Sequence, residues 1–448
     1  MQSSSSTQPT LSRSLGLVHI IVIGLGYMAP MAVFDTFGIV SGETDGHVPA
    51  AYIVTLIAIL CTALSYGHMV RIYPGAGSAY TYAQKTFHPY IGFLVGWISL
   101  LDYLFLPMIN ALLTAIYLSA AFPNVPEWAW IVGFVLLITF LNIFRVNVSA
   151  SVNTLLVCFQ IATVLIFAAL AIQVIQSGAG GGDVFILQPF FADDMSLSSV
   201  LTGASILCFS FLGFDAVSTL SEETKNPKKT IPRGILLIAL IGGTLFTTAS
   251  YFAQVLFPDV STFQDPEAAS PEIALFIGGT VFQAVFLAAA LTSTLASGIA
   301  SHVSASRLLY AMGRDNFLPQ KWFGYVHQGL GTPLFNVWLI GILSLMALFL
   351  DLLTATSFIN FGALTAFTFV NLSVIVHFII KGKARTPKDL FRYLIIPLVG
   401  TSFIAFLWLN LEPHSLMLGL SWATVGLLYL WYRLKWSKQQ VYEFSFEE

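Results

Sequence analysis

The chain has 448 residues, of which 56 % are hydrophobic and 9 % are charged, and its formal net charge is −3. Soluble domains average about a quarter charged residues, so this composition excludes an ordinary soluble protein. The chain also lacks the basic patch of a nucleic-acid-binding protein, and no nucleic-acid partner is expected.

Apolar runs of about 20 residues, long enough to cross a bilayer, fill most of the sequence. They predict an all-α polytopic membrane protein with twelve transmembrane helices. In chain order these cover residues 16–41, 48–70, 89–121, 128–146, 152–176, 199–220, 234–256, 272–302, 334–350, 354–380, 392–411 and 415–432. The first run is longer than a signal-peptide core and lacks a cleavage site, so we expect it to remain a true span. A single membrane domain is predicted at 13–432, between tails at 1–12 and 433–448.

Charge separates across the predicted helices. All 19 Lys and Arg residues fall in alternate loops, at the helix ends that border those loops, or in the two tails. The remaining loops carry acidic residues without basic ones, for example Glu43, Glu127 and Asp351. Because positive residues stay on the cytoplasmic side of the membrane, both termini are predicted to be cytoplasmic.

Two predicted helices carry helix-breaking residues near their middle. The first contains Gly24, Gly26 and Pro30, and the sixth contains Gly213 followed by Asp215. Proline removes an amide donor, and glycine tolerates the conformations that result. Broken helices at matching positions in two halves point to a midplane substrate site of a transporter. The positions match if the chain holds two five-helix repeats and two extra helices, at 16–176, 199–380 and 392–432.

Either interruption taken alone is equally compatible with a packing glycine or a proline kink. The three cysteines lie inside predicted helices and show no metal-ligand spacing, so neither a disulfide framework nor a metal site is expected.

Three segments beside predicted helices carry distinctive strings. Pro74–Tyr82 matches P-x-A-G-G/S-x-Y-x-Y, and Phe211–Pro232 matches F-x-G-F-[DE] continuing to E-E-x-K-N-P-x-[KR]-x-I-P. Ser306–Asp315 matches S-R-x-x-x-x-M-[GA]-R-D. These patterns are common in the amino acid–polyamine–organocation (APC) superfamily of permeases, which the chain resembles from about Leu11 to Trp431.

Longer strings make the resemblance more specific. They are Pro30–Gly42, Asp45–Pro49, Gly77–Lys85, Leu100–Asn110, Phe323–His327 and Ile359–Leu364. These strings are similar to those of the bacterial putrescine importers. The resemblance implies a LeuT-type five-plus-five inverted repeat with helices 1 and 6 broken and two extra C-terminal helices. It also implies a multi-pass protein of the bacterial inner membrane that imports putrescine, driven by a proton gradient and without a cofactor.

Three acidic residues lie inside predicted helices without any Lys or Arg at their depth: Asp35, Asp102 and Asp215. An ionisable residue within the membrane is costly and by default marks a functional site or pathway. A diamine carries an ammonium group at each end, and these groups can pair with such buried carboxylates. Nearby aromatic side chains are expected to cover its methylene chain and to add about 0.5–2 kcal/mol of cation–π attraction each. These are Tyr103, Phe209, Phe211 and Phe214.

Each acid also has a structural interpretation. Asp215 is an ammonium counter-ion or proton acceptor near the broken sixth helix, or else a helix-capping or inner-gate acid. Asp35 lies near the outer mouth, where it contacts either a cation or the following loop. Asp102 belongs either to the site or to an interhelical hydrogen-bond cluster. Tyr103 is favoured for substrate contact, and Asn110, seven residues on, shares its helix face.

The start of the first helix departs from the superfamily pattern. Amino acid permeases usually have a small-residue G-[SA]-G run there, whose exposed amides bind the substrate carboxylate. Here the run reads Gly24-Leu25-Gly26-Tyr27, with bulkier side chains. Exposed amides at a helix start attract anions, so covering them suits a substrate without a carboxylate and makes Tyr27 a candidate contact.

The sequence does not determine which ion is coupled to transport. Some proton-coupled relatives place a lysine in helix five, where this chain has Asn153 and Gln160. A carboxylate must therefore carry any coupling proton, with Asp215 or Asp102 as candidates. Sodium coupling would instead need hydroxyl and carbonyl oxygens, for example those of Ser293, Thr294 and Ser297.

Three other functions can be compared with the sequence. An amino acid permease, or an exchanger of a diamine for its parent amino acid, belongs to the same class. A non-transporting membrane sensor would normally carry a soluble domain, for which this chain has no room. An intramembrane enzyme would need a nucleophile with a base or a metal pair at one depth, and the sequence shows neither, so no enzymatic activity is expected.

Overall fold

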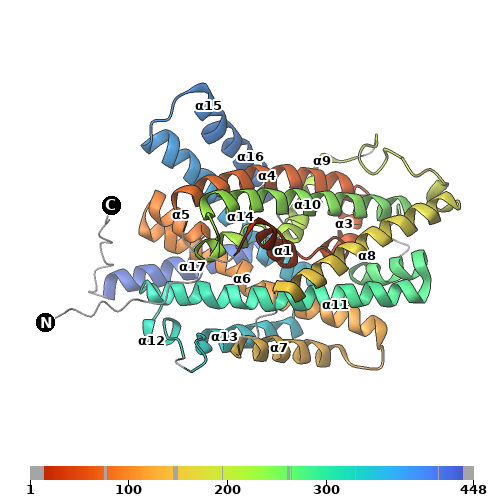
Figure 1. Cartoon of the computed structure of the whole chain (residues 1–448), viewed down its shortest axis with the longest axis horizontal. Coiled ribbons are helices and arrows are strands. Elements are labelled where there is room, and N and C mark those ends of the chain that lie inside the picture. The colour runs from red at the N-terminus through yellow and green to blue at the C-terminus, as the bar shows by residue number, and fades with distance from the viewer. Residues whose placement is uncertain are drawn as a thin grey trace.

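The computed structural model describes residues 15–74, 78–144, 150–193, 195–259, 263, 265–327, 329–411 and 413–436. Within these residues the regular structure is helical, and no β-strand is formed (Figure 1). The expectation of an all-α protein is therefore confirmed for the described part of the chain.

Ten helical segments of the described chain are long and apolar enough to cross a membrane. They are Leu17–Asp35, Val48–Ile72, Pro89–Ser119, Asn153–Gln176, Leu197–Ser221, Pro227–Leu256, Pro266–Arg314, Leu352–Lys381, Pro387–Leu409 and Pro413–Lys435. Two shorter apolar helices, Glu127–Ile143 and Leu334–Leu348, lie at the predicted spans 128–146 and 334–350. The first of them has 17 residues, or about 25 Å of helix, against a hydrocarbon core of about 30 Å.

The individual helices include short ones outside the predicted spans, at 78–86, 320–323 and 387–390. They include α1 (Leu17–Met28), α2 (Ala32–Asp35), α3 (Phe37–Glu43), α4 (Val48–Ile72), α5 (Ser78–Thr86), α6 (Pro89–Ala121), α7 (Glu127–Ile143), α8 (Ala150–Gln176), α9 (Leu197–Leu207), α10 (Pro227–Leu256), α11 (Ala269–Arg314), α12 (Gln320–Phe323), α13 (Leu334–Ser344), α14 (Leu352–Val374), α15 (Pro387–Leu390), α16 (Ile396–Leu409) and α17 (Pro413–Trp436).

Both predicted interruptions are present. The first segment stops at Met28, the end of α1, and resumes at Ala32 with α2. The sixth runs from α9 into the 3-10 turn η2 (Cys208–Phe211), breaks, and continues as the 3-10 helix η3 (Ala216–Glu223). Proline and glycine therefore interrupt the helices where the sequence indicated.

The eighth segment differs from the prediction of one helix over 272–302. α11 runs from Ala269 to Arg314, and Gly279 inside it has the non-helical angles φ +66°, ψ −168°. The first ten residues therefore leave the main helix axis at this glycine. The pattern of apolar residues did not predict the kink, because the residues of α11 before and after Gly279 are both hydrophobic.

Figure 1 shows α1 in the middle of the bundle, with α4 and α10 on one side and α6 and α11 on the other. α1 contacts α8, α10 and α11, while α4 packs along α10 and α6 packs between α11 and α14. The broken first segment is thus enclosed by helices from both halves of the chain.

A tryptophan pair fastens α17 to α6. The Trp97 indole N–H donates to the Trp422 carbonyl at 2.9 Å, and the Trp422 indole N–H donates to the Trp97 carbonyl at 2.8 Å. The two rings stack with centroids 4.8 Å apart. Both partly buried indole donors are thereby satisfied.

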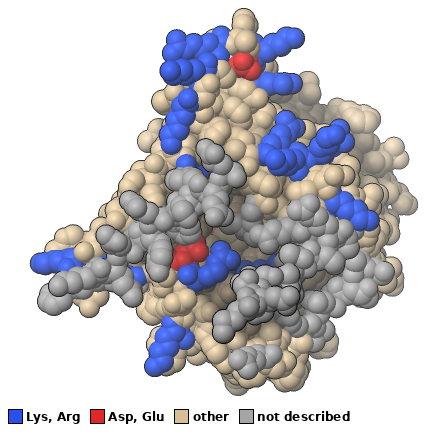
Figure 2. Space-filling model, turned by 60° about the vertical axis from the view of Figure 1, so that its left-hand side comes forward, with Lys and Arg blue, Asp and Glu red and all other residues tan. Residues whose placement is uncertain are grey.

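Basic side chains lie mainly at one end of the helices, and acidic side chains lie at the opposite end. Arg71 ends α4, Lys228 and Lys229 begin α10, and Arg314 ends α11. We call this the basic end, and Figure 2 shows clusters of Lys and Arg with few acidic side chains on the face drawn there. At the opposite ends of these segments stand acids such as Glu43, the last residue of α3; this is the acidic end.

Candidate functional site

A narrow cavity lies between the two broken segments. It leaves about 20 Å³ for the centres of water molecules, room for about one water. Its wall is formed by Tyr27, Met28, Ala29, Ala32 and Asp35 of the first segment, Leu106, Asn110 and Leu113 of α6, Phe209 and Leu212 of the sixth segment, and Ser297 of α11. All of these residues except Ala29 are buried.

The interruption of the first segment brings backbone to the cavity. Ala29 has φ +57°, ψ +98°, a conformation that costs a non-glycine residue about 1–3 kcal/mol. Pro30 follows and supplies no amide hydrogen. The Ala32 amide donates to the Ala29 carbonyl at 2.9 Å, which restarts the helix immediately. A strained backbone held this firmly suggests a functional constraint on the position.

The interruption of the sixth segment faces the first one. Gly213 has φ +102°, and a Cβ added there would lie 2.1 Å from Cδ1 of Tyr27. Only glycine fits, both for its backbone angle and because the Tyr27 ring lies directly against it. The two interruptions are therefore in direct contact.

Neighbouring helices satisfy carbonyl groups of α9 just before the break. The Thr55 hydroxyl donates to the Ala204 carbonyl at 3.0 Å, and the Asn360 amide donates to the Ile206 carbonyl at 3.4 Å. The hydroxyls of Tyr52 and Ser210 lie 3.1 Å apart. Side-chain donors of this kind allow a helix to end at membrane depth.

Asp35 is the acid in the cavity wall. Its carboxylate is 7 % exposed and accepts a hydrogen bond from the Tyr117 hydroxyl of α6. The phenol is a neutral donor, so it orients the carboxylate without supplying a positive charge. Sequence reasoning missed Tyr117, although it lies seven residues after Asn110 and hence on the same helix face.

A polar seam joins α6 to α11 beside the cavity. The Asn110 amide donates to the Ser297 hydroxyl at 3.2 Å, and the Thr114 hydroxyl donates to that of Thr294 at 2.9 Å. Ser297 lines the cavity, whereas the buried Ser293 hydroxyl has no hydrogen-bond partner among the described residues. Of the three α11 hydroxyl residues that could bind sodium, Ser297 thus contacts Asn110 and Thr294 contacts Thr114.

Asp215 lies outside the cavity wall, toward the basic end. It is 7 % exposed, and its carboxylate accepts a hydrogen bond from the Tyr66 hydroxyl of α4 at 3.0 Å. The Tyr66 ring packs edge-on against Phe214 at 5.8 Å and Phe367 at 6.4 Å. This acid, like Asp35, is thus held by a tyrosine, and no Lys or Arg of the described residues forms an ion pair with either acid.

Asp102 and Tyr103 stand beside Asp215, also outside the cavity wall. Asp102 is close enough to interact electrostatically with Asp215 and with Tyr27, and Tyr103 interacts with all three. The backbone of Asp102 packs against Gly362 of α14, where a Cβ would lie 2.8 Å from the Asp102 nitrogen. Tyr27 therefore lines the cavity together with Asp35 and also lies near the other two acids.

The aromatic candidates are divided between cavity and packing. Phe209 lines the cavity together with Tyr27. Phe211 packs edge-on against Phe246 at 5.5 Å, and Phe214 packs against Phe367 at 5.3 Å. The structure therefore brings Tyr27, Asp35, Asn110 and Phe209 of the predicted site together at one cavity, with the remaining candidates around it.

Packed side chains hold Phe34, the neighbour of Asp35 in α2. The Phe34 ring lies edge-on against Phe167 at 4.7 Å and Phe286 at 4.9 Å. The Ser270 hydroxyl at the start of α11 donates to the Phe34 carbonyl. These contacts tie α2 to α8 and to both parts of α11.

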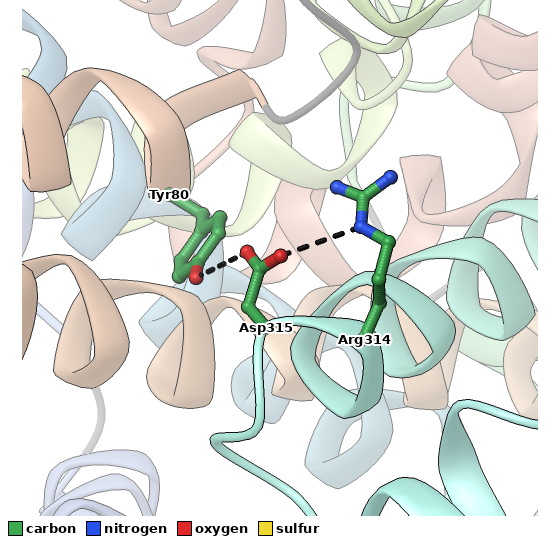
Figure 3. A network of polar contacts seen from close by, with 3 residues as sticks. All are labelled: Tyr80, Arg314 and Asp315. Atoms are coloured by element: carbon green, nitrogen blue, oxygen red, sulfur yellow. Dashed lines mark hydrogen bonds and ion pairs between the residues drawn. The ribbon is translucent and has the colours of Figure 1, made fainter. Parts of the chain in front are cut away.

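At the basic end, two of the distinctive sequence strings meet. The Tyr80 hydroxyl of α5 donates to Asp315 at 2.9 Å, and Arg314 forms an ion pair with the same carboxylate at 3.3 Å (Figure 3). Burial, together with the neighbouring Asp315 charge, raises the pKa of the Tyr80 hydroxyl, so it remains a donor. This contact joins α5 to the end of α11.

The described residues contain no group of three His, Cys, Asp or Glu side chains that could hold a metal ion. The site is built from carboxylates, phenols, one amide and apolar side chains, which suit a small organic cation.

Comparison with known proteins gives consistent matches. The family model for amino acid permeases matches residues 19–411. The chain is 50 % identical to the low-affinity putrescine importer PlaP of Escherichia coli (strain K12), covering 95 % of this chain and 94 % of the relative. It is 27 % identical to the branched-chain amino acid permease BcaP of Bacillus subtilis, and 27 % identical to the methylthioribose transporter of the same species. Each of these matches covers 97 % of this chain and 96 % of the relative.

Proposed function

Because the chain belongs to the amino acid permease family, we propose that it imports putrescine across the bacterial inner membrane as a secondary transporter with alternating access. The observation that carries the proposal is Asp35, a buried carboxylate in the cavity wall held by a neutral phenol. The 50 % identity to a low-affinity putrescine importer over nearly the whole chain supports the same substrate.

In the proposed complex, the carboxylate of Asp35 binds one ammonium group of the diamine. Asp102 and Asp215 attract the second ammonium from behind Tyr27. Tyr27 and Phe209 lie against the methylene chain, and each aromatic face contributes about 0.5–2 kcal/mol of attraction to a nearby cation. Asn110 supplies a further polar contact through the oxygen of its side-chain amide.

The wall of the cavity disfavours an amino acid. Its described lining contains no Lys or Arg, and Asp35 is the one carboxylate among the lining residues. A substrate carboxylate placed here would face a like charge in a poorly hydrated space, which is strongly unfavourable. A diamine has no such group, so this electrostatic difference favours it.

The proposed transport cycle requires the cavity to widen. Room for about one water molecule is too small for a diamine, so the structure corresponds to a nearly closed form. In the proposal, the two interrupted segments act as hinges, and the closures near Phe34 and Tyr80 open in turn. Such alternating gating is typical of inverted-repeat transporters.

The finer architecture belongs to the same proposal. We place twelve helices in the membrane, counting the two shorter apolar ones, with inverted repeats over 16–176 and 199–380. The two helices within 392–432 follow the repeats, and the basic end with both tails, 1–12 and 433–448, faces the cytoplasm. Sorting of Lys and Arg to the basic end supports this orientation.

We also propose that protons drive uptake, with Asp215 or Asp102 as carrier. Both acids lie inside membrane-spanning segments, where carboxylates commonly serve as proton relays of transporters. Uptake by purified protein in vesicles, under separately imposed inward pH and sodium gradients, distinguishes the two ions. Acceleration of uptake by a sodium gradient alone would overturn proton coupling and would favour a sodium site that includes Ser297.

The substrate is tested in the same vesicles with labelled putrescine. We expect accumulation that unlabelled putrescine abolishes and that neutral amino acids leave unchanged. Uptake of a neutral amino acid without putrescine accumulation would show an amino acid permease instead. Putrescine uptake that requires amino acid inside the vesicles would show an exchanger.

A further inference from the structure

A basic pocket of about 450 Å³ lies at the basic end of the molecule, away from the substrate cavity. It is lined by Arg71 of α4 and by Lys228, Lys229 and Arg233 of α10. All four side chains are exposed. The proposed transport of putrescine makes no use of them.

The crossing of α4 and α10 builds this pocket. Gly67 of α4 packs against Pro232 of α10, where a Cβ added to Gly67 would lie 3.2 Å from the proline Cβ. Arg71 follows Gly67 by one helical turn, and Arg233 follows Pro232 directly. Lys229 precedes Arg233 by one turn on the same face. The close contact of the two helices thus brings cations from both to one place.

The four cations are not neutralised by the described acids. In the described part of the chain, the ion pair that forms joins Arg314 to Asp315 at the end of α11. Like charges so close together repel unless an anion lies between them. Figure 2 shows Lys and Arg clusters with few acidic side chains on the face drawn at this end. The pocket is therefore suited to an anion that contacts several of these basic side chains at once.

Exposed apolar side chains continue from this pocket along both helices. Leu240, 45 % exposed, lies two turns beyond Arg233 on the same face of α10. Ile57, 42 % exposed, lies on the same side of α4 as Arg71, about four turns away. An anion site that continues into an apolar surface matches a headgroup with attached acyl chains better than a free anion.

We propose that the pocket formed by Arg71, Lys228, Lys229 and Arg233 binds the phosphate headgroup of an anionic phospholipid, with its acyl chains along α4 and α10. Basic pockets between transmembrane helices on the cytoplasmic side bind such headgroups. Arg guanidinium groups form paired hydrogen bonds with phosphate oxygens, and Lys ammonium groups add point charges. This proposal is independent of the transported substrate.

The test measures retained lipid by native mass spectrometry of the whole protein. Detergent-purified protein is titrated with phosphatidylglycerol and, separately, with zwitterionic phosphatidylethanolamine. We expect phosphatidylglycerol to be retained in preference. The pocket variant Lys228→Gln/Lys229→Gln/Arg233→Gln should bind it at least about tenfold more weakly, since each basic residue near a lipid surface contributes substantially.

The matched control removes three exposed cations elsewhere at the basic end, in Lys383→Gln/Arg385→Gln/Lys388→Gln. It should bind phosphatidylglycerol like the unaltered protein, whereas an equal loss in both triple variants would overturn a specific site. The single change Arg71→Gln, on the other helix, should weaken binding about fivefold. It keeps the proposal testable if the triple pocket variant does not fold.

Inorganic phosphate distinguishes a lipid from a free anion. We expect millimolar phosphate to leave retained phosphatidylglycerol unchanged, because it lacks acyl chains to contact Leu240 and Ile57. Displacement of the lipid by phosphate, or equal retention of phosphatidylethanolamine, would overturn the assignment.

Discussion

Asp35 shows how one residue combines a structural contact with a proposed binding role. Its carboxylate accepts a hydrogen bond from Tyr117 and also faces the cavity. A neutral donor lowers the cost of burying the acid without cancelling its charge, so the carboxylate remains attractive to a cation. A lysine or arginine in the place of Tyr117 would remove that attraction.

Asp35→Asn is expected to weaken putrescine uptake strongly. Loss of a charged hydrogen bond to the ammonium costs about 1.5–3 kcal/mol, which corresponds to roughly a 10- to 100-fold loss of affinity. Competition uptake in vesicles measures this value. Tyr117→Phe keeps the charge and should lose less than about tenfold.

The control for that experiment is Asp351→Asn, because Asp351 is exposed and caps the start of α14 at the acidic end. Its affinity for putrescine should stay within about twofold of the unaltered protein. Unchanged affinity in Asp35→Asn would remove this acid from the proposed site.

Asp215→Asn and Asp102→Asn separate proton coupling from binding. The acid that carries the proton should, when neutralised, lose acceleration of uptake by an inward pH gradient. Exchange of labelled for unlabelled putrescine across the vesicle membrane should continue in that variant at saturating putrescine, because exchange needs no net proton movement. The lost attraction for the second ammonium raises only the putrescine concentration that is needed. Full pH-gradient stimulation in both variants would contradict a carboxylate carrier at these positions.

At the scale of the helix, the contact between Gly213 and Tyr27 couples the two interrupted segments. Glycine is required by the positive φ angle and by the ring that lies against it. A movement of either segment must therefore displace the other. This provides a physical basis for the two segments to act as one hinge region.

Gly213→Ala should destabilise the protein by about 1–3 kcal/mol from backbone strain, with more from overlap with the Tyr27 ring. Thermal unfolding in detergent measures the change. Gly133→Ala is the matched control, because no atom lies within 4 Å of an added Cβ there and the residue is inside helix α7. The control should be neutral or slightly stabilising; equal stability of the two variants would contradict the close contact.

Sequence patterns predicted the helices and their two interruptions well, because apolar length and Gly or Pro positions determine both. The pattern did not show the kink at Gly279, since hydrophobic residues lie on either side of it. It also missed the partnership of Asp35 with Tyr117, which depends on how α2 and α6 are placed in space. The direction of the Phe211 and Phe214 rings, into aromatic packing, depends likewise on neighbours distant in sequence.

At the scale of the whole molecule, the contact of Tyr80 with Asp315 connects α5 to α11 at the basic end. Opening of this end must break that hydrogen bond or carry both helices together. The Tyr80 ring also packs edge-on against Phe317, with centroids 6.3 Å apart. The contact thus has a polar and an apolar part that substitutions can separate.

Tyr80→Phe keeps the ring and removes the hydroxyl, so it should loosen the basic end without unfolding it. A hydrogen bond to a charged group contributes about 1.5–3 kcal/mol, and partial exposure of this one reduces the value. Hydrogen–deuterium exchange of α5 should accelerate by up to about tenfold. Tyr325→Phe, at an exposed tyrosine, should leave exchange in α5 unchanged; unaltered exchange in both variants would show that the ring packing alone holds this end.

The narrowness of the cavity has a consequence for the cell's energy. A cavity with room for about one water molecule, walled mostly by buried side chains, holds too little solvent to form by itself a file of water along which ions could leak. If the protein transports as proposed, such a narrow cavity limits ion leakage while no substrate is bound. A proton gradient that drove uptake would then dissipate mainly with transported substrate and little through idle copies.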